Sequence, residues 1–158
     1  MFGLLAVVAS GCGSGKGAST TTSGPPDPAV AVGGHTIYQG SDWAVVVNGD
    51  HATALHLVGD RWEPDRSGRV KVEFLGPRGT VTPSFQVAAE LSASSPLVES
   101  ALWVDGVELL EKGGGLTTNR GTIYGAPTGP LPKGRHVAVA YARTATSATA
   151  VARVFRVR

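Results

Sequence analysis

Cysteine is nearly absent from this chain of 158 residues, and the one that is present stands near the start. A single cysteine, Cys12, allows no internal disulfide. In an oxidising compartment an unpaired thiol is a liability unless it is used. The chain therefore folds without covalent cross-links, and the role of Cys12 has to be sought in its neighbours.

Charge is scarce as well. Charged residues make up 16% of the chain and the formal net charge is +2. A nucleic-acid interface needs a clustered basic surface. Here the basic residues are spread out, and Arg153, Arg156 and Arg158 alternate imperfectly with Val and Phe, which is typical of a solvated strand face. We predict no nucleic-acid partner.

Long apolar runs are missing from the start of the chain. Residues 2–9 are apolar but too few to cross a bilayer as a helix, although they have the length of a signal-peptide core. The apolar segment runs into the stretch VVASGCGSGKGAST, which has some features of a phosphate-binding loop. That loop requires Gly, four spacers and Gly-Lys-Ser/Thr, followed by a helix. Ser10 stands where the motif requires its first Gly, and Gly17 stands where it requires Ser or Thr. Pro25-Pro26 follow in place of the helix, so we predict that the chain binds no nucleotide.

The four residues Ala9-Ser10-Gly11-Cys12 resemble the lipobox of bacterial lipoproteins, in which small residues precede a cysteine that is lipidated. Ala9 stands where that family usually has Leu, and no Lys or Arg precedes the apolar core. The resemblance implies a signal peptide over 1–11, a lipid on Cys12, and a protein anchored to the extracytoplasmic side of the cell membrane. The alternative is a free cysteine in a short buried strand.

Large apolar side chains are almost absent from residues 13–34, which are mainly Gly, Ser, Thr, Pro and Ala. Such a composition cannot bury enough surface to offset the entropy of ordering. We therefore expect a lipidated, flexible tether over 12–34. About 124 residues follow, which is enough for one domain with its own core.

No twelve-residue segment shows a convincing helical period, whereas strand signals are frequent. Val70, Val72 and Phe74 alternate with charged residues, and the stretch 85–91 alternates in the same way. Two-residue turn signals separate the apolar runs at 47–50, 58–61 and 104–107. The pattern predicts an all-β sandwich or barrel.

The segments ALWVDGVEL, GPLPKGRHVAVAYAR and ATAVARVFRV resemble a bacterial immunoglobulin-like domain. In that family a strand ends in a Val-Asp-Gly hairpin, a Leu-x-x-Gly-x-His step starts a long strand, and the last strand carries Phe-x-Val. The resemblance implies an immunoglobulin-like antiparallel β-sandwich over 67–158 and no particular reaction. Residues 35–66 fall outside it, and their turn signals predict an added three-stranded meander.

Catalytic and metal-binding constellations are not evident. The four histidines are His35, His51, His56 and His136. His51 and His56 lie five apart on one expected strand and so point to opposite faces, and His136 stands where the family has a structural histidine. No Gly-x-Ser-x-Gly elbow is present. We predict no metal, no cofactor and no enzymatic activity.

Aromatic residues make up only 6% of the chain, and the few large rings are the natural candidates for a binding surface. They are Trp43, Trp62, Trp103 and Tyr141, for which packing in the core is the competing interpretation. The hypothesis is a membrane-anchored, immunoglobulin-like module for adhesion, envelope assembly or binding of an envelope protein or polysaccharide. The alternative is a small enzyme or ligand carrier with its site between meander and sandwich.

Two expected strands lack a polar face. Ala138, Ala140 and Ala142 would face one side of strand 136–142 and Val137, Val139 and Tyr141 the other, while Trp103 opposes Leu102 and Val104. An antiparallel sheet usually shows polar residues on one face. We therefore predict that the meander covers the second face and buries Trp103 and Tyr141.

Overall fold

The computed structural model describes residues 24–109 and 118–158. Over these residues the chain is β apart from one helical turn, which confirms the predicted class. The elements are α1 Pro28–Val32, β1 His35–Gln39, β2 Trp43–Asn48, β3 His51–Val58, β4 Arg61–Pro64, β5 Val70–Gly76, β6 Thr80–Val81, β7 Val87–Ala93, β8 Glu99–Val104, β9 Val107–Glu108, β10 Arg120–Gly125, β11 Gly134–Arg143 and β12 Ala148–Val157. The expected signal peptide, Cys12 and the expected tether up to residue 23 lie outside the described residues.

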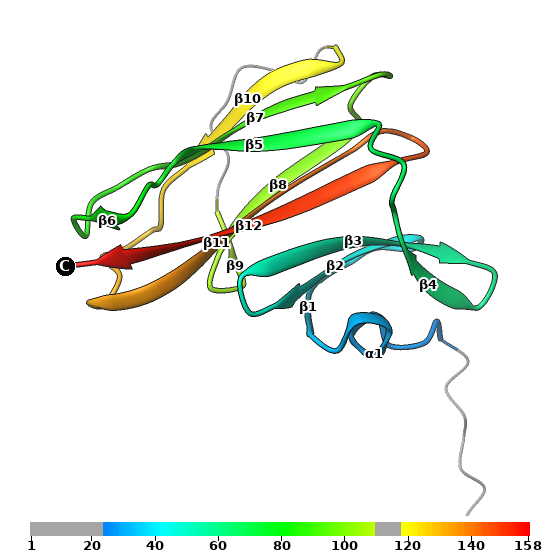
Figure 1. The fold of residues 1–158 in the computed structure, drawn as a ribbon, viewed down its shortest axis with the longest axis horizontal. Coiled ribbons are helices and arrows are strands. Elements are labelled where there is room, and N and C mark those ends of the chain that lie inside the picture. The colour runs from blue at the N-terminus through cyan, green and yellow to red at the C-terminus, as the bar shows by residue number, and fades with distance from the viewer. Residues whose placement is uncertain (1–23, 110–117) are drawn as a thin grey trace, which may run out of the picture.

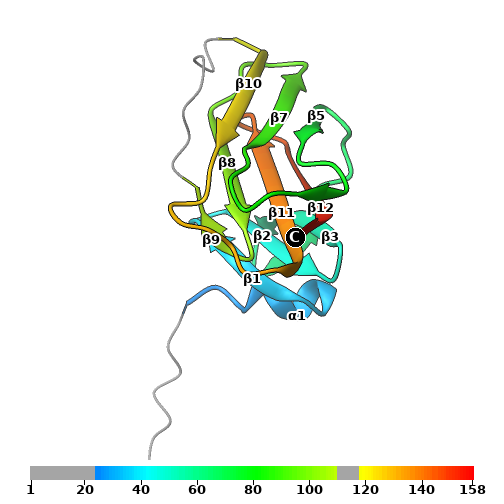
Figure 2. The same ribbon diagram turned by 90° about the vertical axis from the view of Figure 1, so that its left-hand side faces the viewer.

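The strands form three sheets stacked in layers (Figures 1 and 2). The central sheet has the order β6-β12-β11-β8-β9 and lies between the other two. One of its faces packs on the sheet β10-β7-β5, the other on the meander β1-β2-β3-β4. The meander has four strands where the sequence predicted three, because the chain also reverses at residues 40–42, between β1 and β2.

The predicted tight turns at 58–61 and 104–107 are confirmed, and the turn predicted at 47–50 is present one residue later, at 48–51. Strand pairing closes at Asn48 with His51, at Val58 with Arg61 and at Val104 with Val107, which leaves two residues in each turn. Residues with positive φ occupy every turn, namely Gly49, Gly59, Asp105 and Gly106. Such backbone angles match the right-handed twist of the flanking strands, and Gly, Asn and Asp reach them at least cost.

The first core lies between the three-stranded and central sheets. Alternate residues of β5 and β7 point inward, as their sequence pattern predicted. The buried members are Val70, Phe74, Val87, Ala89, Leu91, Leu97, Leu102, Val104, Leu109, Ile123, Ala138, Ala140, Ala142, Phe155 and Val157. Lys71 and Glu73, at the intervening positions of β5, stay exposed.

The second core lies between the central sheet and the meander. Trp103 is 2% exposed and Tyr141 is fully buried, in one cluster with Trp43, Val45 and other meander residues. This confirms that the meander covers the second apolar face of the central sheet. The meander and the sandwich therefore share a core and form one folded unit.

Asp65 joins the meander to the sandwich at the end of the central sheet. Its carboxylate accepts hydrogen bonds from the Ser67 amide at 2.7 Å and from the Ala148 amide at 2.6 Å, where β12 begins. Burial raises the pKa of Asp65, but these hydrogen bonds outweigh it and hold the pKa below its usual value. The segment between β4 and β5 is thus fixed to the sandwich.

Residues 24–34 differ from the expected tether, because they cover the outer face of the meander. Asp27 caps α1 by accepting a hydrogen bond from the Ala29 amide, and Gly33 ends the turn with φ +69°. The Trp62 indole donates to the Pro26 carbonyl at 2.6 Å. Val32 packs on a third, smaller core made of Ala44, Val46, Leu55 and Trp62. The segment is ordered because it packs on apolar residues of the outer face of the meander.

Candidate functional site

The four aromatic residues that the sequence offered as binding candidates are all in the interior. Trp43, Trp103 and Tyr141 lie in the second core and Trp62 lies under α1, with exposures of 6% or less. Their burial favours the competing interpretation, packing in the core, and for Trp103 and Tyr141 it agrees with the predicted cover by the meander. These rings are buried where apolar faces pack together, so they are not accessible to a partner protein.

A hydrogen-bonded network crosses the second core at its edge. The Tyr38 hydroxyl donates to Glu99 Oε1 at 2.7 Å, and Arg143 Nε donates to Glu99 Oε2. Burial and then the hydrogen bond to Glu99 raise the pKa of Tyr38 to about 12. Burial likewise raises the pKa of Tyr141, whose ring centroid lies 5.7 Å from that of Tyr38. The raised pKa keeps both phenols neutral, and the network joins the meander to the central sheet.

Polar atoms without partners also occur in the second core. Among the described residues, Trp43 Nε1 and the Tyr141 hydroxyl are buried and lack a hydrogen bond. The Trp43 ring stacks on His56 at a centroid distance of 4.3 Å and an angle of 12°. His56 of β3 is the cross-strand partner of Trp43 in β2, so this stacking lies within the meander.

A second polar arrangement joins the turn between β8 and β9, the start of β11 and the loop 126–133. His136 Nδ1 lies 2.6 Å from Asp105 Oδ2, and its Nε2 lies 2.8 Å from the Pro132 carbonyl oxygen. The other oxygen of Asp105 accepts from the Val137 amide at 2.9 Å. The hydrogen bond to Asp105 raises the pKa of His136 against the opposing effect of burial. Both ring nitrogens face acceptors, which suits the protonated imidazole.

Two hollows flank the loop that His136 holds. One, of about 270 Å³, lies between Pro83–Phe85 and the loop residues 126–130. The other, of about 360 Å³, lies between the β8–β9 hairpin and loop residues 127–131, and is mostly apolar. Val107 at its rim is 66% exposed. The loop between the two hollows is exposed at residues 128–130, so both hollows open to the surface beside it.

A third hollow, of about 260 Å³, opens between the meander and the central sheet. It is lined by His35, Ile37, Val47, Gly49, Asp105, Gly106, Val137 and Val139. None of the groups with a shifted pKa lines it; those groups are Tyr38, Asp65, His136, Tyr141 and Arg143. The hollow offers apolar contact from Ile37, Val47 and Val139, and its titratable lining residues are His35 and Asp105. The carboxylate of Asp105 is already engaged by His136 and by the Val137 amide.

The histidines do not converge. His51 lies beside Asp50, His56 stacks on Trp43, and His136 is bound to Asp105. Within the described ranges, no three His, Cys, Asp or Glu side chains are grouped as a metal site would require.

No protein-family model matches the chain, and no curated protein matches it either. Over residues 24–109 and 118–158, no helix is long and apolar enough to cross a membrane. The features that sequence reasoning missed are the Tyr38–Glu99–Arg143 network and the Asp105–His136–Pro132 contact. Both depend on which strands pair, and only the family resemblance at Asp105 and His136 hinted at the second.

Proposed function

We propose that this protein is a lipid-anchored, extracytoplasmic interaction module whose folded part is an immunoglobulin-like sandwich with a covering meander. It acts by holding a partner, without catalysis. The observation that carries the proposal is the exposed loop 126–131 with a hollow on each side, one of them mostly apolar, and with Val107 exposed beside it. A rigid β scaffold that presents a loop surface is a common design for binding.

Strand order supports the immunoglobulin-like assignment. Strands β5, β7 and β10 correspond to A, B and E of that fold, while β8, β9, β11 and β12 correspond to C, C′, F and G. The chain leaves β5, crosses to the central sheet, and pairs in parallel with the end of β12 through β6. Asp105 and His136, which carried the sequence resemblance, contact each other.

Anchoring through Cys12 sets how far the domain stands from a membrane. Residues 13–23 separate Cys12 from Gly24, and a fully extended backbone spans at most about 3.5 Å per residue, hence about 40 Å in all. In Figure 1 the described chain begins at the side of α1 and β4, whereas β6 and the C-terminal end of β12 lie at the opposite end. The loop 126–133 therefore points away from the attachment point.

Two measurements test the proposal. The full chain, expressed with a complete export signal, is expected in the membrane fraction with labelled fatty acid, and Cys12→Ser is expected to release it. A photoreactive residue at 107 is then expected to cross-link an envelope component in cells, while one at Val58, also exposed in the meander, should not. A soluble, unlabelled protein would overturn the anchoring, and equal cross-linking at both positions would overturn the loop surface.

The hollow between meander and central sheet favours one second candidate, a carrier of a small apolar ligand. Its volume of about 260 Å³ is slightly below the usual range for ligand pockets. Mass spectrometry under native conditions on protein purified from its own envelope would reveal a bound molecule. A chain of unmodified mass, apart from the lipid, would dismiss the carrier.

A further inference from the structure

Two arginines lie directly opposite each other at the end of the central sheet. Arg135 of β11 and Arg156 of β12 are cross-strand partners and both are exposed. Side chains opposite each other in an antiparallel pair have Cβ atoms about 5 Å apart, and like charges at that spacing are destabilising. The sequence alone showed Arg156 only as one of several arginines on a strand face.

Three more cations gather around this pair. The Arg156 amide donates to the Gly79 carbonyl at 2.9 Å, which brings the neighbouring Arg78 to the same end. Lys133 precedes Gly134, whose cross-strand partner is Val157, and Arg158 follows Val157. We name Arg78, Lys133, Arg135, Arg156 and Arg158 the cationic corner; all five are exposed.

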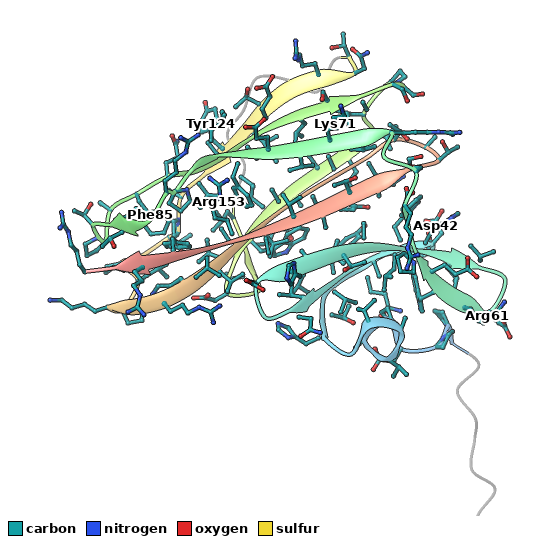
Figure 3. All side chains as sticks on the ribbon, viewed as in Figure 1. Asp42, Arg61, Lys71, Phe85, Tyr124 and Arg153 are labelled. Atoms are coloured by element: carbon teal, nitrogen blue, oxygen red, sulfur yellow. The ribbon has the colours of Figure 1, made fainter. Side chains whose placement is uncertain are left out.

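Arg153, labelled in Figure 3, is different, because its side chain is held by contacts with Phe74. Its guanidinium lies 5.2 Å from the centre of the Phe74 ring, and its Nη1 donates to the Phe74 carbonyl. It therefore does not belong to the corner. The structure thus separates Arg153 from Arg156 and Arg158, which the sequence presents as one alternating run.

No Asp or Glu side chain forms an ion pair with the corner among the residues that the structure describes, since the ion pairs found there involve other basic residues. The sequence explains this, because residues 74–89 and 112–158 contain no Asp or Glu. The chain has a formal net charge of +2, so the part outside these five cations carries 2 − 5 = −3. Positive charge is concentrated at one end of a molecule that is otherwise acidic.

We propose that the cationic corner binds a linear polymer that carries phosphate groups along its backbone and no bases. Arginine guanidinium groups bind phosphate oxygens in a bidentate way, and an anion between Arg135 and Arg156 would relieve their repulsion. The cations are spread over three adjacent chain segments, from Gly79 through β12 to β11, at the usual strand spacing of about 4.8 Å. A row of charges suits a chain of anions better than a single phosphate.

The choice of a polymer over the protein's own membrane rests on the proposed function. In Figure 1 the corner lies at the end of the molecule opposite the start of the described chain, so a domain anchored through Cys12 presents the corner away from the membrane. A polymer that extends through the envelope would meet it there. The loop 126–133 adjoins the corner through Lys133, so both would face the same partner.

The test uses the full chain with Cys12→Ser as the common background, so that no lipid contributes to binding. Long-chain inorganic polyphosphate is the probe, titrated at several salt concentrations. The double variant Arg135→Gln/Arg156→Gln is compared with Arg61→Gln/Arg69→Gln, which removes two exposed arginines elsewhere. We expect about tenfold weaker binding for the corner variant, and a slope of log affinity against log salt that is smaller by roughly 1.4 if each lost contact contributes about 0.7.

Each alternative ligand has its own arm. Orthophosphate at the same total phosphate concentration is expected to bind far more weakly than polyphosphate. Equal binding of the two would overturn the proposal that the ligand is a polymer. Vesicles with anionic phospholipid and single-stranded DNA of matched phosphate number complete the series, and tighter corner-dependent binding to either would reassign the surface to a membrane or to nucleic acid. Equal losses in the two double variants would overturn the site itself. The melting temperature of the corner variant is expected to be unchanged or higher, which excludes misfolding, and membrane fractionation of lipidated protein reports on anchoring separately.

Discussion

The hydroxyl of Tyr38 in β1 donates a 2.7 Å hydrogen bond to the carboxylate of Glu99 in β8, and so joins the meander to the central sheet. Glu99 is held at the same time by Arg143 in β11, which shares the central sheet with it. The network lies at the edge of a core that is otherwise apolar. It gives the docking of the meander a direction and a register that apolar packing alone would not specify.

Replacing Tyr38 by Phe is expected to lower the free energy of unfolding by about 1–2 kcal/mol, because a hydrogen bond to a charged acceptor is lost while the ring remains. Chemical denaturation monitored by tryptophan fluorescence measures this. Tyr124→Phe, on the outer sheet β10, is the control and should change stability by less than about 0.5 kcal/mol. Equal effects of the two substitutions would show that the Tyr38 hydroxyl contributes nothing.

The raised pKa of Tyr38 predicts a loss of stability at high pH. Its folded-state pKa of about 12 exceeds the ordinary value of 10.0, so its contribution is complete below pH 10 and disappears as the pH rises towards 12. An absorbance titration of phenolate in the folded protein should therefore show a late-ionising tyrosine that Tyr38→Phe removes. A titration curve that is unchanged by the substitution would contradict the prediction.

Removal of the meander tests whether the second core is essential. A chain that starts at Ser67 would expose Trp103, Val139 and Tyr141, which are all buried in the whole domain. Full burial of each large apolar side chain contributes about 1.5–3 kcal/mol, so we expect lower stability, binding of a hydrophobic dye and aggregation. A soluble monomer as stable as the complete domain would contradict the shared core.

Several elements of this fold were predictable from local chemistry. The hairpins at Gly49, Gly59 and Asp105-Gly106 were evident because each turn demands residues that reach positive φ. The covering of the central sheet was predictable too, because Trp103 and Tyr141 leave it without a polar face. In both cases the signal is contained within a few neighbouring residues.

Features that depend on partners distant in the sequence were not predictable. The segment 24–34 has the composition of a tether, and only Asp27 before Pro28 and Gly33 after the turn resemble helix caps. Its order comes from Trp62, which lies 36 residues further along than Pro26. The aromatic rings were equally ambiguous, because a ring on a strand face looks the same in sequence whether a partner or another sheet covers it.

The capping segment should therefore be separable from the rest of the fold. Trp62→Phe removes the donor to the Pro26 carbonyl and keeps most of the packing, and Asp27→Ala removes the cap of α1; each is expected to cost about 1 kcal/mol. Hydrogen exchange should show faster exchange of the Gly33 amide, which donates to Ala29 within the turn. Asp60→Ala, in the exposed turn between β3 and β4, is the control. Unaltered exchange at Gly33 in both variants would mean that the turn holds without these contacts.

His136 gives the domain a pH dependence near neutrality. The hydrogen bond to Asp105 raises its folded-state pKa above 6.5, so its contribution is complete below pH 6.5 and is lost as the pH rises through the folded-state value. The other charged groups on the described elements around it are Asp105, which it contacts, and Lys133 and Arg135 in the same stretch of chain. The melting temperature of the protein should therefore fall between pH 6 and pH 9 relative to that of His136→Gln, which cannot be protonated. His51→Gln, at an exposed turn, should follow the unsubstituted protein at every pH. A constant difference between the protein and His136→Gln across this range would show that His136 is neutral in the fold, with Asp105 held by the Val137 amide alone.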